Sequence, residues 1–296
     1  MVCVGLTVLD VVQRVAEPVA WGRKHVSIAA EVAAGGPAAN AAVCAARLLG
    51  SAVLVTGLGD SRAAAVVRAE LESYAVRVVD LAPPGWSLPV AACLVDAAGE
   101  RTVVSPGALT TSWRLPAEAV ELVARADVLL LDGHHPAAAG AALAALAGAS
   151  AGPPRPLSVL DAGSAKPHAE EWLGRLDVVA GSADYAAGLG LDAQAAVAHI
   201  LAAGAGAAVM TDGARDILWA QRRGSAGRVT PPTVAAVDTL GAGDAFHGGL
   251  AAALAAGLAL APAVGFAAQV GAARVATAGA RSWLDALPPP TGRRSH

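Results

Sequence analysis

The sequence predicts an α/β fold, in which a doubly wound and mostly parallel β-sheet is flanked by helices. Short apolar runs that suit buried parallel strands recur along the chain, and beyond about residue 115 they alternate with helical stretches, as in βα units. Polar residues gather where these runs end, which is the edge at which doubly wound sheets bind their ligands. A further set of β-like segments predicts a second, smaller sheet.

The strands of the main sheet are expected in chain order. Residues 2–6 form a short apolar run that suits a buried strand. Runs of the same kind follow at 52–56, 76–79, 128–131, 157–160, 178–180 and 207–211. An antiparallel ribbon is expected at 217–220 and near Val229, and a β-branched run at 233–237 predicts a last strand. The helices are expected after the glycines at 35–36 through about 49, and at 63–73, 192–203 and 245–257.

The second sheet is predicted from two segments. Residues 11–34 lack a helical pattern, and positions 26–30 alternate as in a half-exposed strand. Two β-like runs on either side of the turn at 96–100 predict a hairpin. The sequence thus divides into a main domain, a small sheet and a disordered tail. The expected bounds are 1–10, 35–86 and 107–290 for the domain, 11–34 and 87–106 for the small sheet, and 291–296 for the tail.

Composition and charge exclude several classes of protein. The chain has 296 residues, of which 15% are charged and 55% hydrophobic, so a globular rather than a disordered chain is expected. Its net charge of -3, with no basic block, argues against a nucleic-acid partner. Cys3, Cys44 and Cys93 are scattered, which predicts reduced thiols in a cytoplasmic protein. Residues 248–273 carry no charge, but Pro262 splits them, so two buried helices are expected there and no membrane span.

The stretch from Val237 to Gly249 carries the clearest chemical signal. Its glycines let the backbone turn sharply and approach a ligand, and the free N–H groups at the start of a helix attract anions. Gly241, Ala242 and Gly243 can therefore form a cradle for an anion. Asp244 lies in the same cradle, where a carboxylate would oppose a phosphate unless it takes a proton from an attacking hydroxyl. A cradle with a base is what phosphoryl transfer to an alcohol requires.

This stretch resembles a family signature. Residues 238–244 (DTLGAGD) match the DTxGAGD motif of the PfkB, or ribokinase-like, carbohydrate kinases, and residues 35–42 resemble that family's GGxxxNxA segment. The resemblance covers the chain from Asp10 to about Trp283. It implies a ribokinase-like fold with the small sheet as a lid over the sugar. It also implies transfer of the γ-phosphate of ATP to a primary hydroxyl of a sugar or sugar derivative, with Mg²⁺. Asp244 would be the catalytic base, and residues 241–243 would form the anion hole.

The resemblance also implies roles for residues outside this stretch. The residues expected to contact the sugar are Asp10, Gly35, Gly36 and Asn40. The residues expected to line the nucleotide are Asp184, Thr211, Asp212, Gly213 and Gly243. A monovalent-cation site, which implies K⁺, is expected at Asp238, the backbone of Leu240, Thr277 and Gly279.

The opening of the chain is most similar to a sulfosugar-kinase-like branch of the family. The shared features are VGxTVxD, a lysine (Lys24) and GGPAA, and the residues that this branch would place near the substrate are Lys24, Ser105 and His134. The polar and basic residues expected around Ser105 and His134 are lacking, so the sequence does not indicate a sulfonate. His134 and His135 do not indicate a metal site, because adjacent side chains point in different directions and no third ligand is evident.

Two departures from the family pattern leave other functions open. The NxxE motif aligns with Gly181–Asp184, so its Asn is absent and its Glu is shortened to Asp, and Asp216 replaces a glycine of the TxGxxG turn. A sugar-binding pseudokinase that acts as a sensor is one alternative. A nucleoside or vitamin kinase of the same fold is another, although aromatic residues are only 3% of the chain. A homodimer is expected, because pairing two lids would cover an apolar face and unpaired edges.

Overall fold

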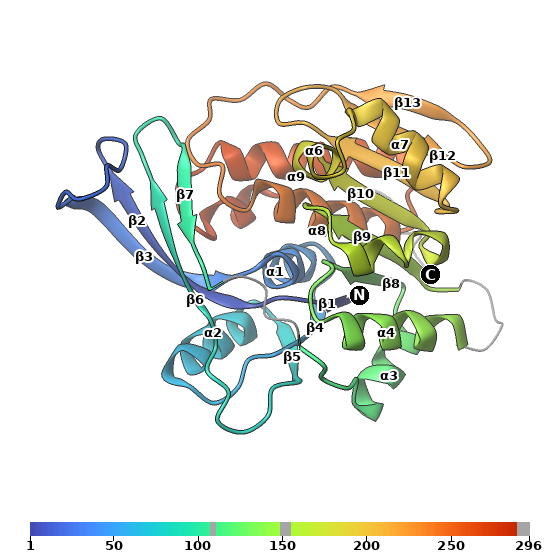
Figure 1. Ribbon diagram of the computed structural model, residues 1–296, viewed down its shortest axis with the longest axis horizontal. Helices are drawn as coiled ribbons and strands as arrows, with labels where there is room; N and C mark the ends of the chain where they lie inside the picture. The colour runs from blue at the N-terminus through green and yellow to red at the C-terminus, as the bar shows by residue number, and fades with distance from the viewer. Residues whose placement is uncertain (107–110, 149–154, 289–296) are drawn as a thin grey trace.

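The computed structural model describes residues 1–106, 111–148 and 155–288 (Figure 1). Its larger sheet has nine strands, and β11–β12 and β12–β13 are its antiparallel pairs in the described chain. From one edge to the other the strands are β13 (Ala226–Val229), β12 (Ile217–Gln221), β11 (Ala207–Thr211), β10 (Val178–Ser182), β9 (Leu157–Ala162), β8 (Val128–Leu131), β1 (Val2–Val4), β4 (Ala52–Thr56) and β5 (Val76–Asp80). This arrangement confirms the predicted doubly wound, mostly parallel sheet.

Helices cover both faces of this sheet. They are α1 (Pro37–Leu49), α2 (Arg62–Ser73), α3 (Ala117–Ala124), α4 (Pro136–Gly148), α5 (Pro167–Glu170), α6 (Ala183–Gly188), α7 (Ala193–Ala202), α8 (Ala242–Ala255) and α9 (Leu260–Val275), with 3₁₀ turns at Leu173–Arg175 and Ser282–Ala286. Successive strand residues point to opposite faces, so Cys3 belongs to a buried cluster that includes residues of α1, α2, α8 and α9, whereas Val2 and Val4 belong to one that includes residues of α3, α4 and α7. Both faces are therefore buried, as parallel sheets require.

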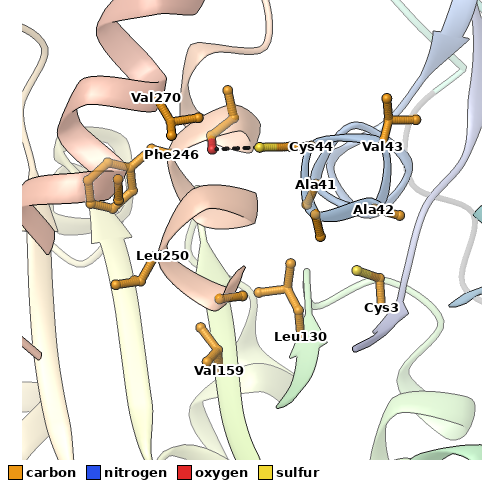
Figure 2. Close-up of a cluster of buried hydrophobic side chains, with 14 of the residues drawn as sticks. Cys3, Ala41, Ala42, Val43, Cys44, Leu130, Val159, Phe246, Leu250 and Val270 are labelled. Carbon is orange, nitrogen blue, oxygen red and sulfur yellow. Dashed lines mark hydrogen bonds between the residues drawn. The ribbon is translucent and has the colours of Figure 1, made fainter. Parts of the chain in front are cut away.

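Small residues allow α8 to lie close to α1 and α9. A Cβ on Gly248 would come within 2.8 Å of the carbonyl oxygen of Ala41, and one on Gly249 would come within 3.0 Å of Val270. Figure 2 shows the resulting core, in which the Cys44 thiol of α1 donates a hydrogen bond to the carbonyl of Ala245 at 3.6 Å. This close packing holds the first turn of α8 next to the first turn of α1, and the site is built there.

The second sheet has four strands in the order β3 (Ser27–Gly35), β2 (Val8–Val15), β6 (Val90–Val95) and β7 (Arg101–Val104). β2 pairs antiparallel with β3 and parallel with β6, and β6 and β7 form the predicted hairpin. These strands extend away from the main body, at the left in Figure 1. β2 begins at Val8, so Asp10 lies within this sheet.

Two details of the predicted elements were wrong. Residues 233–237 form no strand: they are exposed, and none of the strands in the described residues pairs with them. The amides of Val237 and Asp238 instead donate to the carbonyl of Val275, at the end of α9, at 2.9 and 3.1 Å. Helix α8 begins at Ala242 and not at Ala245, so the glycine-rich run itself forms the first helical turn.

The remaining predictions concern the uncharged stretch, the cysteines and the tail. The uncharged stretch at 248–273 forms parts of two separate helices, α8 and α9. Within the described residues, no helix is both long and apolar enough to span a membrane. Cys3, Cys44 and Cys93 are buried and unpaired with one another. The expected tail at 291–296 lies outside the described residues.

Candidate active site

The candidate site lies at the carboxyl ends of the central strands. β1 pairs with β4 on one side and β8 on the other, which makes this the topological switch point of the sheet. Asp132 follows β8 and is 2% exposed, and its Oδ2 accepts the amides of Leu6 (2.8 Å) and Ala38 (3.1 Å). Burial alone would raise the pKa of Asp132, but His134 and these amides hold that pKa below its usual range. Asp132 thus ties the start of α1 to the ends of β1 and β8.

The predicted glycines at the start of α1 are required by close contacts. Gly36 has φ of 96°, and a Cβ there would lie 2.4 Å from the carbonyl oxygen of Leu6. A Cβ on Gly35 would lie 2.1 Å from the Oδ2 atom of Asp10. Gly35 therefore lets the carboxylate of Asp10 lie directly against the backbone that leads into α1, and Gly36 lets this backbone pass close to Leu6.

The predicted anion cradle is the amino end of α8. Gly241 is its N-cap with φ of 71°, and Ala242, Gly243 and Asp244 form the first turn. The first N–H groups of a helix have no partner within the helix, and the helix dipole makes this end attractive to anions. Asn40 of α1 donates from Nδ2 to the Oδ2 atom of Asp244 at 2.7 Å. The structure therefore brings together the residues predicted as anion hole, base and sugar contact.

Buried charges surround Asp244. Burial first, and the charge of Asp161 second, raise the pKa of Asp244 to about 6, although the bond from Asn40 opposes this shift. His247 lies one helical turn further along α8, and its two ring nitrogens face the Asp161 carboxylate and the Ala180 carbonyl, both at 3.1 Å. Burial alone would lower the pKa of His247, but Asp161 outweighs it and raises that pKa. Since both ring nitrogens face acceptors, the surroundings favour the doubly protonated, positively charged form of His247.

Asp10 shares a pocket with Asn40 and Gly241. Its carboxylate reaches this pocket from β2 of the small sheet, whereas the other two residues come from the main domain. Burial, followed by the charge of Asp244, raises the pKa of Asp10 to about 6. The predicted sugar-binding residue and the predicted base are therefore close enough to influence each other's ionisation.

Sequence reasoning missed Arg281, which also lines this pocket. Its Nη1 donates to the Oδ1 atom of Asn40 at 2.9 Å, its Nε donates to Glu70 at 2.8 Å, and its Nη2 donates to the carbonyl of Ala34. Asn40 is thus held on both sides, by Arg281 and by Asp244. Arg281 closely follows the 277–279 turn in the sequence, but nothing in the sequence indicates that its side chain faces Asn40.

The residues predicted to line the nucleotide lie at the ends of β10 and β11. These strands are parallel neighbours, and Thr211 donates from Oγ1 to the carbonyl of Gly181 at 3.3 Å. Asp212 accepts two bonds of 2.6 Å from Arg215, Gly213 has φ of 56°, and Asp184 is exposed in the first turn of α6.

The missing asparagine of the NxxE motif has a packing reason. A Cβ on Gly181 would lie 2.7 Å from the sulfur of Met210 and 3.0 Å from the ring of Tyr185. The Met210 side chain therefore takes the space into which a side chain at position 181 would project.

The residues suggested by the sulfosugar-like opening do not join this pocket. Lys24 is exposed in the connection beyond the paired ends of β2 and β3, and Ser105 is exposed after β7. His134 lies beside Asp132, with Nδ1 at 3.1 Å from Oδ1, and His135 contacts Thr111 at 2.8 Å. The two adjacent histidines thus face different partners. In the described part of the chain, no three His, Cys, Asp or Glu side chains are grouped to hold a metal ion.

Two of the residues predicted to hold a monovalent cation, Asp238 and Thr277, contact a second missed arginine, Arg274. Asp238 is 1% exposed, and its Oδ2 accepts bonds from Arg274 at 3.0 Å and from Arg14 at 2.5 Å. Arg274 also donates to the carbonyl of Thr277 at 3.1 Å. Burial alone would raise the pKa of Asp238, but these two guanidinium groups outweigh it and lower that pKa. The Asp238 carboxylate and the Thr277 carbonyl thus already bond a fixed positive charge.

Comparison with known proteins agrees with this geometry. The sequence matches the model of the pfkB family of carbohydrate kinases over residues 1–287. Similar solved structures include a candidate ribokinase from Agrobacterium tumefaciens (24% identity, TM-score 0.84, 98% of this chain and 94% of that chain). They also include a ribokinase from Thermotoga maritima (22% identity, TM-score 0.80, 98% of this chain and 96% of that chain). A third is an Arabidopsis thaliana ribokinase complexed with ribose and ATP (21% identity, TM-score 0.76, 98% of this chain and 96% of that chain). At these identities the structures establish the shared ribokinase fold. Because the family match spans nearly the whole chain, the protein belongs to the pfkB family of carbohydrate kinases, which are phosphotransferases with an alcohol group as acceptor.

Proposed function

We propose that this chain transfers the γ-phosphate of ATP to a primary hydroxyl of a sugar or sugar derivative, with Asp244 as the general base. The observation that carries the proposal is the position of Asp244 in the first turn of α8, where its carboxylate accepts a hydrogen bond from Asn40. The N–H groups of residues 241–243 would receive the phosphate, for which the amide of Ala242 would give up its 3.3 Å bond to the carbonyl of Thr239. Asp244 would take the proton of the attacking hydroxyl. Positioning and charge stabilisation would supply most of the acceleration.

The sugar would bind between the small sheet and the main domain. Asp10 reaches the pocket from β2, and Asn40 and Gly241 reach it from α1 and α8. A carboxylate and a carboxamide give an acceptor and a mixed donor–acceptor, which suit neighbouring hydroxyl groups. Arg281 would hold the amide of Asn40 in a fixed orientation through its 2.9 Å bond.

The nucleotide would lie along the ends of β10 and β11, next to the amino end of α8. Thr211, Asp212 and Gly213 form the turn there, and Gly243 lies in the first turn of α8. Mg²⁺ keeps most of its water ligands and is held largely by substrate phosphates, so one exposed carboxylate suffices as the protein's contribution. Asp184 fits that requirement, because it is exposed on the first turn of α6.

The small sheet would act as a lid and as a dimer contact. The strand register places Val32, Val90 and Val104 on the face opposite to Asp10, and they are 53%, 46% and 56% exposed. Apolar side chains on one face of a small sheet, together with its unpaired edges, favour pairing with a second copy. The buried, unpaired cysteines fit a reducing compartment such as the cytoplasm.

A substrate panel tests this proposal. Consumption of ATP should be measured with ketoses, aldoses, polyols, nucleosides and vitamin alcohols, and thermal melting should be measured with the same compounds. Turnover with a sugar and not with a nucleoside or vitamin supports the proposal. A sugar-specific rise in melting temperature without ATP consumption would favour the sensor, for which the packing of Met210 against Gly181 is the specific observation. Turnover with a nucleoside or vitamin alone would contradict the sugar assignment.

A further inference from the structure

A buried group of charges lies directly behind the proposed anion hole. Asp238 and Arg274 are 1% and 3% exposed. Arg274 donates from Nη2 to the Asp238 carboxylate at 3.0 Å, and from Nη1 to the carbonyls of Thr277 (3.1 Å) and Asp238 (3.4 Å). The same carboxylate and the same 277–279 turn are the groups that the family resemblance assigns to a monovalent cation.

The guanidinium group supplies what such a cation would supply. It is permanently charged, it has only donors, and its planar fork can bond several oxygens at fixed angles. Arg274 lies in the last turn of α9, where a positive charge is also favoured by the helix dipole. Its position is fixed by the helix and by three acceptors, so it forms a permanent part of the fold.

The local charge balance disfavours an additional ion. Asp238 accepts from both Arg274 and Arg14, and Arg14 also lies 3.7 Å from the carboxylate of Glu31. Two positive and two negative side chains thus compensate each other. A potassium ion among the same oxygens would add an uncompensated charge a few ångströms from a buried guanidinium, where repulsion is only weakly screened. The residues present therefore do not fit a bound K⁺.

We propose that Arg274 replaces the monovalent cation in this chain and makes its activity independent of K⁺. Arg274 acts as a positioning residue. It fixes Asp238, whose Oδ1 accepts the amide of Leu240 at 3.0 Å, and Leu240 directly precedes the N-cap Gly241. The chain of contacts from Arg274 to Gly241 would hold the anion hole in its binding geometry. This inference rests on the proposed role of residues 241–243.

The first experiment compares salts on the wild-type protein. The melting temperature, and the kcat for the acceptor identified by the substrate panel, should be measured in KCl and in an equal concentration of tetramethylammonium chloride. We expect the two kcat values to agree within about twofold and the melting temperatures to coincide, because no cation site is open. A rise in kcat or melting temperature that is specific to K⁺ would overturn the inference while leaving the kinase proposal intact.

The second experiment opens the site by mutation. Arg274→Ala should lower kcat by roughly 10- to 100-fold, which is the loss expected when a residue that orients a functional group from behind is removed. The KM for the sugar should change less. Potassium or guanidinium, but not tetramethylammonium, should then raise its melting temperature and restore part of its kcat. Arg68→Ala is the matched control, because it removes an arginine paired with Asp80 away from this site, and it should show no cation-specific response.

Each outcome of these experiments decides the inference. If Arg274→Ala folds but neither K⁺ nor guanidinium stabilises or reactivates it, Arg274 has a packing role only and the inference fails. Arg274→Lys, which keeps the charge but loses the fork, should fall between the wild type and the alanine variant in kcat. If the alanine variant does not fold, the salt comparison on the wild type decides alone. The melting measurements need no turnover, so they remain decisive even if no sugar is phosphorylated.

Discussion

The amide of Asn40 donates to the carboxylate of Asp244 at 2.7 Å, although the two residues lie 204 positions apart in the sequence. Each lies in the first turn of a helix, and α1 and α8 pack closely because Gly248 has no side chain. The bond therefore depends on the fold and is not a local contact. It orients the Asp244 carboxylate and leaves its second oxygen to receive a proton.

Replacement of the base should abolish most turnover. Asp244→Asn keeps the size of the side chain but cannot take the proton of the acceptor hydroxyl. We expect kcat to fall roughly 10²- to 10⁴-fold, and ATP affinity to stay equal or improve, because a negative charge leaves the phosphate site. Steady-state kinetics and nucleotide titration measure these effects. Retention of more than about a tenth of the wild-type kcat would show that Asp244 is not the base.

Activity should rise with pH through about 6. Burial and Asp161 raise the pKa of Asp244 to about 6, and the base must be ionised to act. The pH profile of kcat between about pH 5 and 8 should show this limb. Asp10 has a similarly raised pKa, so the profile should also be measured for Asp10→Asn. If the limb disappears in that variant, its origin is Asp10 and not Asp244.

The same shift predicts how stability depends on pH. The folded-state pKa of Asp244 is raised from 3.8 to about 6, so the folded chain retains a proton that the unfolded chain has already lost. The stabilising contribution of this group is present below about pH 4 and is lost as pH rises through about 6. The melting temperature of Asp244→Asn should therefore equal or exceed that of the wild type at pH 8. A clear loss of stability at that pH would contradict the assigned environment.

Loss of the carboxylate of Asp10 should weaken sugar binding selectively. Asp10 reaches the pocket from β2, away from the strand ends assigned to the nucleotide, and hydroxyls of a bound sugar would lose their acceptor in Asp10→Ala. We expect a large rise in KM for the sugar and little change in KM for ATP. Asp127→Ala, an exposed carboxylate at the amino end of β8, is the control. An equal rise in both constants would remove Asp10 from the sugar site.

The sequence was sufficient for elements whose pattern is local. Apolar runs predicted the buried strands, and the glycines at 35–36 predicted the start of α1, whereas α8 begins at Ala242 and not at the expected Ala245. The strand predicted at 233–237 does not form, and that prediction was wrong because β-branched residues favour an extended backbone whether or not a neighbouring strand is available to pair with it. Arg274 and Arg281 were missed for a different reason. An arginine has no positional signature, and only the fold shows that these two face Asp238 and Asn40.

The exposed face of the small sheet should form a dimer contact. The strand register places Val32 on the side away from Asp10, where its side chain is 53% exposed beside other apolar residues. Val32→Lys would bring a charge into an apolar contact, and burying an unpaired charge is strongly unfavourable. We expect the wild type to have the mass of a dimer by light scattering at micromolar concentration and the variant to have that of a monomer. Val66→Lys is the control, because Val66 is 50% exposed on α2 outside this sheet, and it should remain a dimer. A monomeric wild type would refute the assembly, and a dimeric Val32→Lys would place the interface elsewhere.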